Sequence, residues 1–491
     1  MTERFKNLLN KIKVYQSIEN VTLIEKAFVF AQKAHEGQKR INGKDFIVHP
    51  LGVAEILVSW HLDAGSIMAG LLHDVVEDGG VTLERLGKEF GKDITQLVNG
   101  VTKIGEIKLR GTDDDIFVEN LRKMIVVMAH DLRVILVKLA DRYHNLKTLY
   151  VLPLEKQKRI AKETLEVYAP LAERLGMGEI KGQLEDMAFP YAEPEKYKHL
   201  KKQTASYYKQ ASEDIKDFKR EVLKNLVTKG IKAQVNGRQK HLYSLFKKLY
   251  RPKVNKDINK IYDLMALRII VNTIEECYIA LGLIHNLYKP VPSVGVRDFI
   301  AQPKPNGYQS IHTNVFARGR IIEIQIRTRK MHEEAENGIA AHWYYAQQKM
   351  KKVDNPQIKV GFFAPTEKMS WVNELVQWQK EIVGSKEFLD SLKFDALNHR
   401  IFVFSPKGDV YDLPADATPV DFAYAVHSDL GDQCAGAKVD GRMVGLDFKL
   451  KSGQVVEILT DKNKKKPSTD WLNFVMTQQA RRKIAKHIHS S

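Results

Sequence analysis

The chain has 491 residues, with 77 Lys or Arg against 60 Asp or Glu, which gives a formal net charge of +17. This length exceeds a single hydrophobic core and predicts roughly three or four domains. Only two cysteines occur, Cys277 and Cys434, which excludes a disulfide framework or a cysteine zinc site and favours a reducing cytoplasm.

The basic balance favours polyanionic partners such as nucleotides or RNA, although a well-solvated lysine-rich surface explains it equally well. No apolar stretch has the form of a secretory leader or reaches the length of a membrane span. We therefore expect a cytoplasmic protein that does not contact a membrane.

The first 180 residues show helical periodicity almost throughout. Amphipathic repeats occur in TLIEKAFVFAQKAH, PLGVAEILVSW, IFVENLRKMIVVMA and RVILVKLADRYHNLKTL. This pattern predicts an all-helical domain over residues 1–180. Residues 181–229 then read as a charged helical spacer, whose charge predicts solvent on most sides.

The segment AGLLHDVVEDGG carries polar residues at helical spacing inside an apolar run. Taken as a helix, it gathers on one flank four polar side chains, namely His73, Asp74, Glu77 and Asp78. Burying carboxylates among aliphatic side chains costs several kcal/mol unless they are paired. A bound cation is the simplest way to offset this cost, because it pairs with the carboxylates.

Further metal ligands occur in two other apolar helices, where FIVHPLGVAEIL contains His49 and VILVKLADRYHNL contains Asp141. Two imidazoles and two carboxylates suit a borderline or moderately hard divalent ion such as manganese. An isolated histidine on an apolar face is more often a satisfied core residue. The full set nevertheless predicts a metal site made of His49, His73, Asp74 and Asp141.

Residues 230–346 change to a mixed α/β pattern, with the β-rich runs DLMALRIIVN and RIIEIQIRT and the helical run ECYIALGLIHNLY. Before them, GRQKHLYSLFKKLYR concentrates positive charge along one side of a helix. Such an array can hold several phosphates, and a plain basic surface helix is the alternative. The residues concerned are Arg238, Lys240, His241, Ser244, Lys247, Lys248 and Arg251.

Two acids are placed on the predicted strands. Asp263 opens the first run, and Glu323 lies in the second, whose polar residues we expect on a solvated face. Carboxylates beside a phosphate cradle fit magnesium-assisted phosphoryl transfer. The loop KPNGYQSIH between them offers Tyr308 for stacking on a base, together with Lys304, Asn306 and His312. Neither a P-loop nor a GxGxxG motif is present.

The C-terminal third divides into three parts. Residues 347–392 read as a linker followed by one helix. Residues 393–461 combine a hairpin around Pro-Lys-Gly-Asp, a helix in VDFAYAVHSDL and a strand in QVVEIL, which predicts a small β-grasp-like module. Residues 462–491 are basic and begin a helical region, where solvated charge and RNA contact explain the composition equally well.

The ordered motifs closely resemble those of the long RelA/SpoT homologues (Rel proteins). The resemblance covers essentially the whole chain and rests on LLHDVVEDG, VKLADRYHNLKTL, YAPLAERLGMGEIKGQLEDMAF, GRQKHLYSLFKK, IYDLMALRI, PKPNGYQSIHT, EIQIRT and AAHWYY. It implies a multidomain α and α+β fold. An all-helical HD hydrolase domain, a mixed α/β nucleotidyltransferase-like synthetase domain and a small β-grasp TGS domain follow one another.

The resemblance further implies metabolism of the alarmones ppGpp and pppGpp. In hydrolysis to GDP or GTP and pyrophosphate, the four-residue site would bind Mn²⁺, Glu77 and Asp78 would handle the attacking water, and Arg40 and Asn145 would contact the alarmone. In synthesis, pyrophosphate would move from ATP to the 3′-hydroxyl of GDP or GTP.

For synthesis the resemblance assigns Mg²⁺ to Asp263, the acceptor hydroxyl to Glu323 and guanine stacking to Tyr308. ATP would be held by the basic set Arg238, Lys240, His241, Ser244 and Lys248. In the TGS domain, His427 would read the CCA end of deacylated tRNA, which fits single-stranded RNA recognition.

Three departures from the family pattern stand out. Ile41 follows Arg40 where the family often has Lys, which removes a cation near the hydrolase nucleotide. Residues 295–298 read GVRD instead of RxKD, which affects the choice between GDP and GTP. The sequence stops just after the TGS domain, so full ribosome anchoring is not expected. Two alternatives to a bifunctional enzyme stay open: a hydrolase-dominant enzyme with a weak synthetase, and a tRNA-sensing module with vestigial sites.

Overall fold

The computed structural model describes residues 3–106, 130–250, 265–292, 295–304, 307–317, 319–341, 400–461 and 466–489. The chain forms two compact units. The first contains Met1–Tyr208, Lys240–Ile261 and His332–Ser385, and the second contains Lys209–Gln239, Tyr262–Met331 and Lys386–Ser491. The predicted helix at 116–129 and the predicted linker and helix at 347–392 lie outside the described residues.

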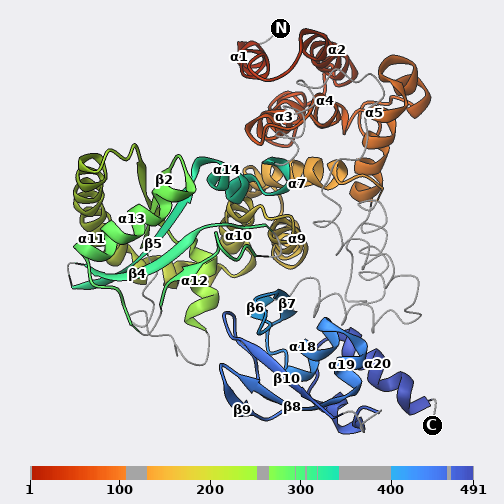
Figure 1. Cartoon of the computed structure of the whole chain (residues 1–491). Helices are drawn as coiled ribbons and strands as arrows, with labels where there is room; N and C mark the ends of the chain where they lie inside the picture. Colours follow the sequence, from red (N-terminus) through yellow and green to blue (C-terminus); the bar gives the residue numbers. More distant parts are fainter. Residues whose placement is uncertain are drawn as a thin grey trace. The chain divides into compact units, whose positions relative to one another are not determined.

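The N-terminal domain is helical, as predicted, and is drawn from red through orange to yellow in Figure 1. A short 3-10 turn and a π-helical turn occur between its later helices. The helices are α1 (Glu3–Ile12), α2 (Ile18–Ala34), α3 (Val48–Ser59), α4 (Ala64–Leu72), α5 (Leu83–Glu106), α7 (Arg133–Leu146), α8 (Leu154–Glu163), α9 (Ala169–Arg174) and α10 (Gly178–Ala192).

Helices α3, α4 and α7 form the centre of this domain. Helix α3 packs against both α4 and α7, and most of its side chains are buried. Local caps fix where the neighbouring helices begin: Ser17 accepts a hydrogen bond from the amide of Asn20, and Asp63 accepts one from the amide of Ser66. The site residues of this domain therefore project from rigid, well-packed elements.

The HDVVED segment does not continue helix α4, contrary to the helical reading of the sequence. Helix α4 ends at Leu72, and the residues from His73 to Asp78 form turns. Val75 still enters the core, whereas Glu77 and Asp78 are exposed. The turn uses only some helix-like bonds, such as Asp78 N to Asp74 O at 2.8 Å. Apolar spacing alone does not separate a helical turn from a series of tight turns.

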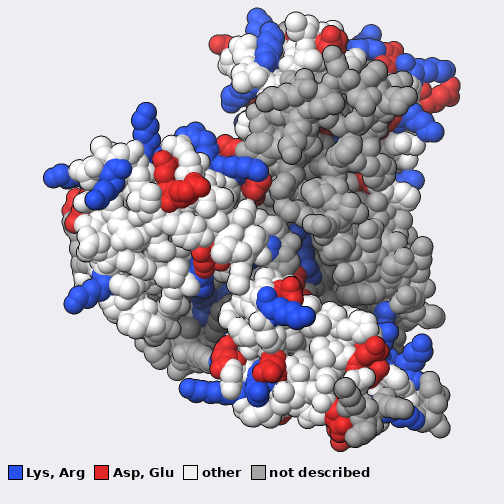
Figure 2. All heavy atoms as spheres, viewed as in Figure 1, with Lys and Arg blue, Asp and Glu red and all other residues white. Residues whose placement is uncertain are grey.

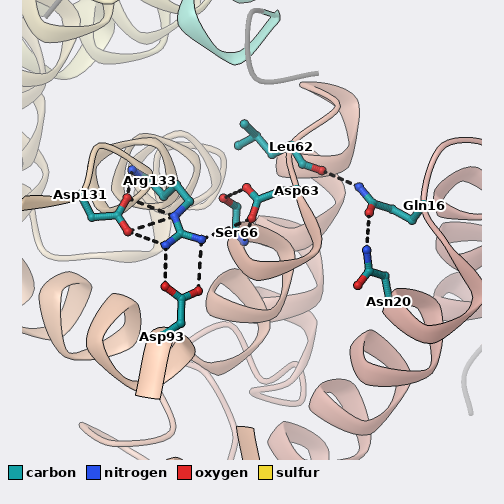
Figure 3. Close-up of polar contacts among 8 residues, drawn as sticks. All are labelled: Gln16, Asn20, Leu62, Asp63, Ser66, Asp93, Asp131 and Arg133. Carbon is teal, nitrogen blue, oxygen red and sulfur yellow. Dashed lines mark hydrogen bonds and ion pairs between the residues drawn. The ribbon is translucent and has the colours of Figure 1, made fainter. Parts of the chain in front are cut away.

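A buried guanidinium holds the start of α7 (Figure 3). Arg133 pairs with Asp131 at 2.6 Å, with Asp93 of α5 at 3.0 Å and with Asp63 at the start of α4 at 3.5 Å. Burial alone lowers the pKa of Arg133, but the three carboxylates outweigh it and raise that pKa. Two distant chain segments, at Asp63 and at Asp93, are thereby tied to the first turn of the helix that carries Asp141.

The second unit contains the mixed sheet that the sequence predicts. Its strands are β1 (Gln234–Gln239), β2 (Met265–Val271), β3 (Arg297–Asp298), β4 (Ile311–Ala317) and β5 (Arg320–Thr328). Their order is β1-β2-β5-β4-β3, with only β2 and β5 parallel. Helix α13 (Ile274–Leu287) contacts β2, β4 and β5, and its capping box at Thr273 and Glu276 fixes its first turn.

The predicted spacer is helical, and most described residues of its long helix are exposed, as the charge predicts, but one face of that helix is packed. Helix α11 (Pro194–Thr228) supplies Phe218, Val222 and Leu226 to the same buried core as the sheet. These apolar residues recur every three to four positions, which gives the helix an apolar stripe within a highly charged sequence. The high charge of the α11 sequence therefore did not indicate that one face of this helix packs against the sheet.

Strand β5 is buried on both faces, contrary to the expected solvated face. Ile324 and Ile326 are fully buried in the core, and on the alternate face Gln325 and Arg327 are 6% and 1% exposed. Parallel pairing with β2 and antiparallel pairing with β4 place this strand in the middle of the sheet. Strands that pair in parallel are usually covered on both faces, and β5 pairs in this way with β2.

The C-terminal module has two small antiparallel sheets. One pairs β6 (Arg400–Phe404) with β7 (Val410–Pro414), as the predicted hairpin requires, and the other orders β10 (Val456–Thr460), β8 (Cys434–Val439) and β9 (Arg442–Val444). A parallel bridge joins Phe404 to Val455. Helix α18 (Pro419–Val426) contacts β7, β8 and β10 and is followed by the short α19 (Ser428–Asp432).

The segment after the last strand belongs to this module. A 3-10 turn (Thr469–Asn473) and helix α20 (Gln478–His489) pack Trp471, Val475 and Ile484 into a core shared with α18. The buried Asp421 caps α18 through Thr418 and also accepts hydrogen bonds from the amides of Met476 and Thr477.

Among the described residues, no helix combines the length and apolar character needed to span a bilayer. Cys277 and Cys434 are buried free thiols. On the face shown in Figure 2, the described Lys and Arg side chains are interspersed with Asp and Glu. The net positive charge therefore does not gather into one uniform patch on that face.

Candidate metal and nucleotide sites

Three helical elements bring the predicted metal ligands together. His49 comes from the first turn of α3, His73 directly follows α4, and Asp141 lies in α7. All three are buried, and one ligand atom from each lies within 4.8 Å of the others. The Nε2 atom of His49 is 3.2 Å from Oδ1 of Asp141. Their spacing suits donors arranged around one cation.

Asp74 completes the predicted set. Its Oδ1 lies 3.0 Å from Nε2 of His73, and its Oδ2 lies 3.5 Å from Nε2 of His49. Two imidazole nitrogens and two carboxylates therefore face a common point. This mixed nitrogen and oxygen set suits a divalent transition ion.

The hydrogen bonds of His73 prepare its second nitrogen for a metal. Nδ1 lies 2.9 Å from the carbonyl oxygen of Gly70, which can only accept, so Nδ1 carries the proton. Nε2 then has a lone pair, and it is buried without a hydrogen-bond partner among the described residues. Burial lowers the pKa of His49, which favours the neutral ring that binds metals. The residues present thus fit a divalent ion.

Two neighbours on α7 hold the carboxylate of Asp141. Lys138 Nζ lies 2.9 Å from Oδ2, and Asn145 Nδ2 donates to Oδ1 at 2.6 Å. Burial alone raises the pKa of Asp141, but the positive charge of Lys138 and the bond with His49 hold it well below its usual range. The carboxylate is therefore ionised and ready to bind a cation. Lys138 was not predicted from the sequence.

A cavity of about 350 Å³ opens beside Asp141. Arg40 reaches its rim and donates to Asn145 Oδ1 at 2.9 Å, which brings the two predicted alarmone contacts together. Ile41, the departure from the family pattern, also lines the cavity. Three further basic residues that the sequence reading missed do so too: Lys138, Arg142 and Arg159. Four cations beside a metal site suit a ligand with several phosphates.

Glu77 and Asp78 lie outside the group of metal ligands. Both are exposed, and partial desolvation together with the nearby Asp74 carboxylate raises the pKa of each. A carboxylate with a raised pKa is a stronger base than an ordinary one. The handling of water by these two residues stays a prediction.

The predicted phosphate cradle includes α12 (Leu242–Leu249), and much of the charge on and next to this helix is already paired. His241 Nδ1 lies 2.8 Å from Oδ2 of Asp186, and Lys247 Nζ lies 2.7 Å from Oε1 of Glu185. Ser244 Oγ also donates to Glu185, at 3.3 Å. Both acids come from α10 and were missed because nothing in the local sequence links them to α12.

The ion pairs of His241 change its charge state. Burial alone lowers its pKa, but hydrogen bonds to Asp186 and Glu179 raise it to about 9. His241 is therefore a cation at neutral pH. Lys240 and Lys248 lie in the same unit, whereas Arg238 lies on β1 in the second unit. Asp263, Asn306 and Arg251 are outside the described residues.

Strands β4 and β5 bring Glu323 and His312 together. His312 Nδ1 lies 3.3 Å from Glu323 Oε1, and the hydroxyl of Tyr308 lies 2.8 Å from His312 Nε2. A carboxylate accepts, so Nδ1 carries the ring proton and Nε2 accepts from Tyr308. Lys304 lies over the rings of Tyr308 and Phe299 at 5.0 and 4.7 Å. Among the described residues of the predicted base-binding set, His312 contacts Glu323 directly, and Tyr308 and Lys304 lie beside His312 and Tyr308 in turn.

Arg297, from the unusual GVRD sequence, joins this cluster. Its guanidinium lies 2.8 Å from Glu323 Oε1. Arg297 of β3 lies opposite His312 of β4, whose partner on β5 is Gln325, so the contact with Glu323 is diagonal and reaches two residues further along β5. The departure from the family pattern is therefore in direct contact with a predicted catalytic acid.

His427 lies between α18 and α19 with a side chain that is 69% exposed. Its Nδ1 accepts a hydrogen bond from the amide of Asp429 at 3.2 Å and so caps α19. The ring is accessible to a partner.

The fold and these clusters define a multidomain protein with a helical HD-type metal site followed by a mixed-sheet domain. Comparison with known families agrees. Residues 27–178 match the HD domain, residues 237–350 match the region found in RelA / SpoT proteins, and residues 401–460 match the TGS domain. The chain belongs to the RelA/SpoT family.

Three relatives illustrate the match. The GTP pyrophosphokinase of Myxococcus xanthus is 45% identical over 96% of this chain and 61% of its own length. Guanosine-3′,5′-bis(diphosphate) 3′-pyrophosphohydrolase of Aquifex aeolicus is 45% identical over 95% of this chain and 64% of its own length. The bifunctional (p)ppGpp synthase/hydrolase SpoT of Escherichia coli is 42% identical over 98% of this chain and 66% of its own length. The chain spans about three-fifths of the length of the first two.

Proposed function

We propose that this chain both makes and degrades (p)ppGpp. At the helical site it hydrolyses (p)ppGpp to GDP or GTP and pyrophosphate. In the sheet domain it transfers pyrophosphate from ATP to the 3′-hydroxyl of GDP or GTP. The observation that carries the proposal is the converging set of His49, His73, Asp74 and Asp141 beside a basic cavity. Relatives with both kinds of activity in their names support it.

In hydrolysis, we assign Mn²⁺ to the four converging residues. A bound divalent ion supplies Lewis-acid chemistry, polarising phosphoryl oxygens and acidifying water. Glu77 and Asp78, whose pKa values are raised, accept the proton from the attacking water. Arg40 and the other cations of the cavity bind the phosphates. Asn145 orients Arg40 and Asp141 at once.

In synthesis, we assign Mg²⁺ to Asp263 and the acceptor 3′-hydroxyl to Glu323. The contact with His312 orients the Glu323 carboxylate, and Tyr308 in turn fixes the imidazole. Tyr308 stacks on guanine, with Lys304, Asn306 and His312 around it. Phosphates and adenine of ATP are held by Arg238, Lys240, His241, Ser244 and Lys248. The two activities alternate, because running together they would only consume ATP.

A hydrolase-dominant enzyme is the second candidate. The pairing of His241 with Asp186, of Ser244 with Glu185 and of Glu323 with Arg297 favours it, because these contacts occupy groups that synthesis would use. The metal site, by contrast, has donors directed at a common point. In this case the rate of (p)ppGpp breakdown exceeds the rate of its formation in the isolated protein.

We also propose cytoplasmic function and contact of the TGS domain with deacylated tRNA and the ribosome. The exposed ring of His427 supports the tRNA contact. Base stacking on an accessible side chain is a common mode of single-stranded RNA recognition. A pure tRNA-sensing module with inactive enzyme sites would bind tRNA and turn over neither nucleotide.

Two nucleotide assays on the full chain test the proposal. Labelled ATP with GDP and Mg²⁺ should yield ppGpp, and ppGpp with Mn²⁺ should yield GDP and pyrophosphate. Addition of EDTA should stop both reactions. Hydrolysis without any synthesis would establish the hydrolase-dominant alternative, and absence of both reactions would leave only the binding module.

A further inference from the structure

We propose that His144 is a positioning residue of the metal site that fixes the ring of His49. This inference rests on the proposed metal site and extends it to a residue that does not itself touch the metal. It is carried by three observations, namely the contact between the two imidazoles, the glycine against which His144 lies, and the cavity beside it.

The first observation is a hydrogen bond between the two rings. Nδ1 of His49 and Nδ1 of His144 are 2.8 Å apart, with ring centroids separated by 4.8 Å. His49 faces Asp74 and Asp141 through Nε2, so a metal bound there takes the lone pair of Nε2 and leaves the proton on Nδ1. His49 therefore donates, and Nδ1 of His144 accepts. Metal-bound histidines usually donate their second N–H to such a partner.

The second observation concerns Gly52, one turn after His49 in α3. A Cβ atom at this position would lie 2.3 Å from Nε2 of His144, much closer than any real contact. A glycine inside a helix costs about 1 kcal/mol relative to alanine. Its backbone has ordinary helical geometry, so conformational freedom does not explain it. The need to leave space for the His144 ring explains the glycine at this position.

The third observation is a cavity of about 530 Å³ lined by both His144 and Gly52. None of the four metal ligands lines it. Tyr143, Lys147 and Glu179 are among its other residues. His144 thus lies between the metal ligands and a separate cavity, and a change of its ring angle would reach His49 directly.

Four variants of the full chain separate positioning from simple packing. In His144→Asn, the side-chain oxygen can still accept from His49, whereas His144→Leu fills similar space without an acceptor. In Gly52→Ala, the new methyl group displaces the His144 ring. Tyr143→Phe is the matched control, because it changes the neighbouring residue in the same cavity and leaves His144 untouched.

The readout is the dissociation constant of Mn²⁺, measured by loss of the free-ion EPR signal, with hydrolysis of ppGpp as a second measurement. Loss of an outer partner of a metal ligand typically costs 10-fold to 100-fold in affinity. We expect about 10-fold weaker Mn²⁺ binding for His144→Leu and Gly52→Ala. We expect wild-type binding for Tyr143→Phe and recovery of most of the affinity in His144→Asn.

A double variant gives the sharpest comparison. Once His144→Ala has removed the ring, adding Gly52→Ala should weaken Mn²⁺ binding no further, since both changes act through one side chain. Equal Mn²⁺ affinity in wild type, His144→Leu and Gly52→Ala would overturn the inference, as would additive losses in the double variant. Failure of the wild-type chain to bind Mn²⁺ would instead overturn the proposed metal site.

Discussion

The metal cluster at His49 and the basic helix α12 are both built from charged side chains, but their charges are balanced in opposite ways. In the metal cluster, two carboxylates and two imidazoles face one point, and Nε2 of His73 has no hydrogen-bond partner among the described residues. On α12, His241 and Lys247 are already paired with the acids of α10. The first arrangement has ligand atoms directed at one point where a cation fits, even though Lys138 already pairs with the other oxygen of Asp141, whereas the second must exchange its partners to bind phosphate.

Removal of a metal ligand should give the largest effect and shows whether the two sites are separate. In Asp74→Ala, we expect hydrolysis of ppGpp to fall by at least about 10³-fold, because metal assistance contributes several kcal/mol. Synthesis from ATP and GDP should be retained, as measured in the same preparation. Loss of both activities in a folded variant would show that one site serves both reactions.

The reverse test uses Glu323. We expect Glu323→Gln to lower the rate of synthesis by about 10²-fold to 10⁴-fold, the usual effect of losing a general base. The amide keeps the size of the carboxylate, and the hydrolysis rate serves as the control. If synthesis were unchanged, Glu323 would be only a partner of Arg297 and His312.

The frame of the metal site can be tested at Arg133, whose side chain is 7% exposed. Arg133→Leu leaves three carboxylates without their cation, and we expect a loss of about 3–5 kcal/mol in unfolding free energy, measured by urea denaturation. Asp93→Asn is the matched control, because Asp93 is 44% exposed and its pair contributes about 1 kcal/mol or less. Equal effects of the two changes would contradict the assigned burial.

The paired state of α12 predicts a pH dependence. The pKa of His241 is raised from its ordinary 6.5 to about 9 in the folded protein, so its stabilising contribution is complete below about pH 6.5 and is lost as the pH rises through 9. The shift corresponds to about 3 kcal/mol at most. The difference in unfolding free energy between wild type and His241→Gln should therefore shrink from pH 6 to pH 9.5. A constant difference would mean that His241 is not a cation.

Removal of the acid that pairs with Lys247 of α12 should have the smallest effect on the activities. In Glu185→Gln, Lys247 loses its ion pair and becomes available to a phosphate. We expect the KM for ATP to fall by about tenfold, the equivalent of one charge-assisted hydrogen bond. Hydrolysis should not change. A higher KM would show that Glu185 positions these groups for ATP and does not compete with it.

The convergence of the proposed metal ligands could be predicted from the sequence because each lies in a short apolar segment with few other polar residues. His49, His73, Asp74 and Asp141 converge as expected. The turn that follows Leu72 could not be predicted, since apolar spacing fits a helix and a tight turn equally well. The helices and the mixed sheet followed from their periodicity.

Long-range pairing was the main feature that the sequence did not reveal. The contacts of Glu185 and Asp186 with α12 join residues about 60 positions apart, and no local pattern encodes them. Burial of Arg327 likewise depends on the central place of β5 in the sheet, which strand order decides. The apolar stripe of α11 was hidden because its charged residues dominate the composition.

The contacts of Asp421 also define how much chain the C-terminal module needs in order to fold. The family match ends at residue 460, but the carboxylate of Asp421 is satisfied by amides at Met476 and Thr477. A fragment ending at residue 461 would leave this buried charge with fewer donors and remove Trp471 and Ile484 from the core around Tyr424. The smallest autonomous unit therefore extends into α20, and the basic tail of the sequence is part of its architecture.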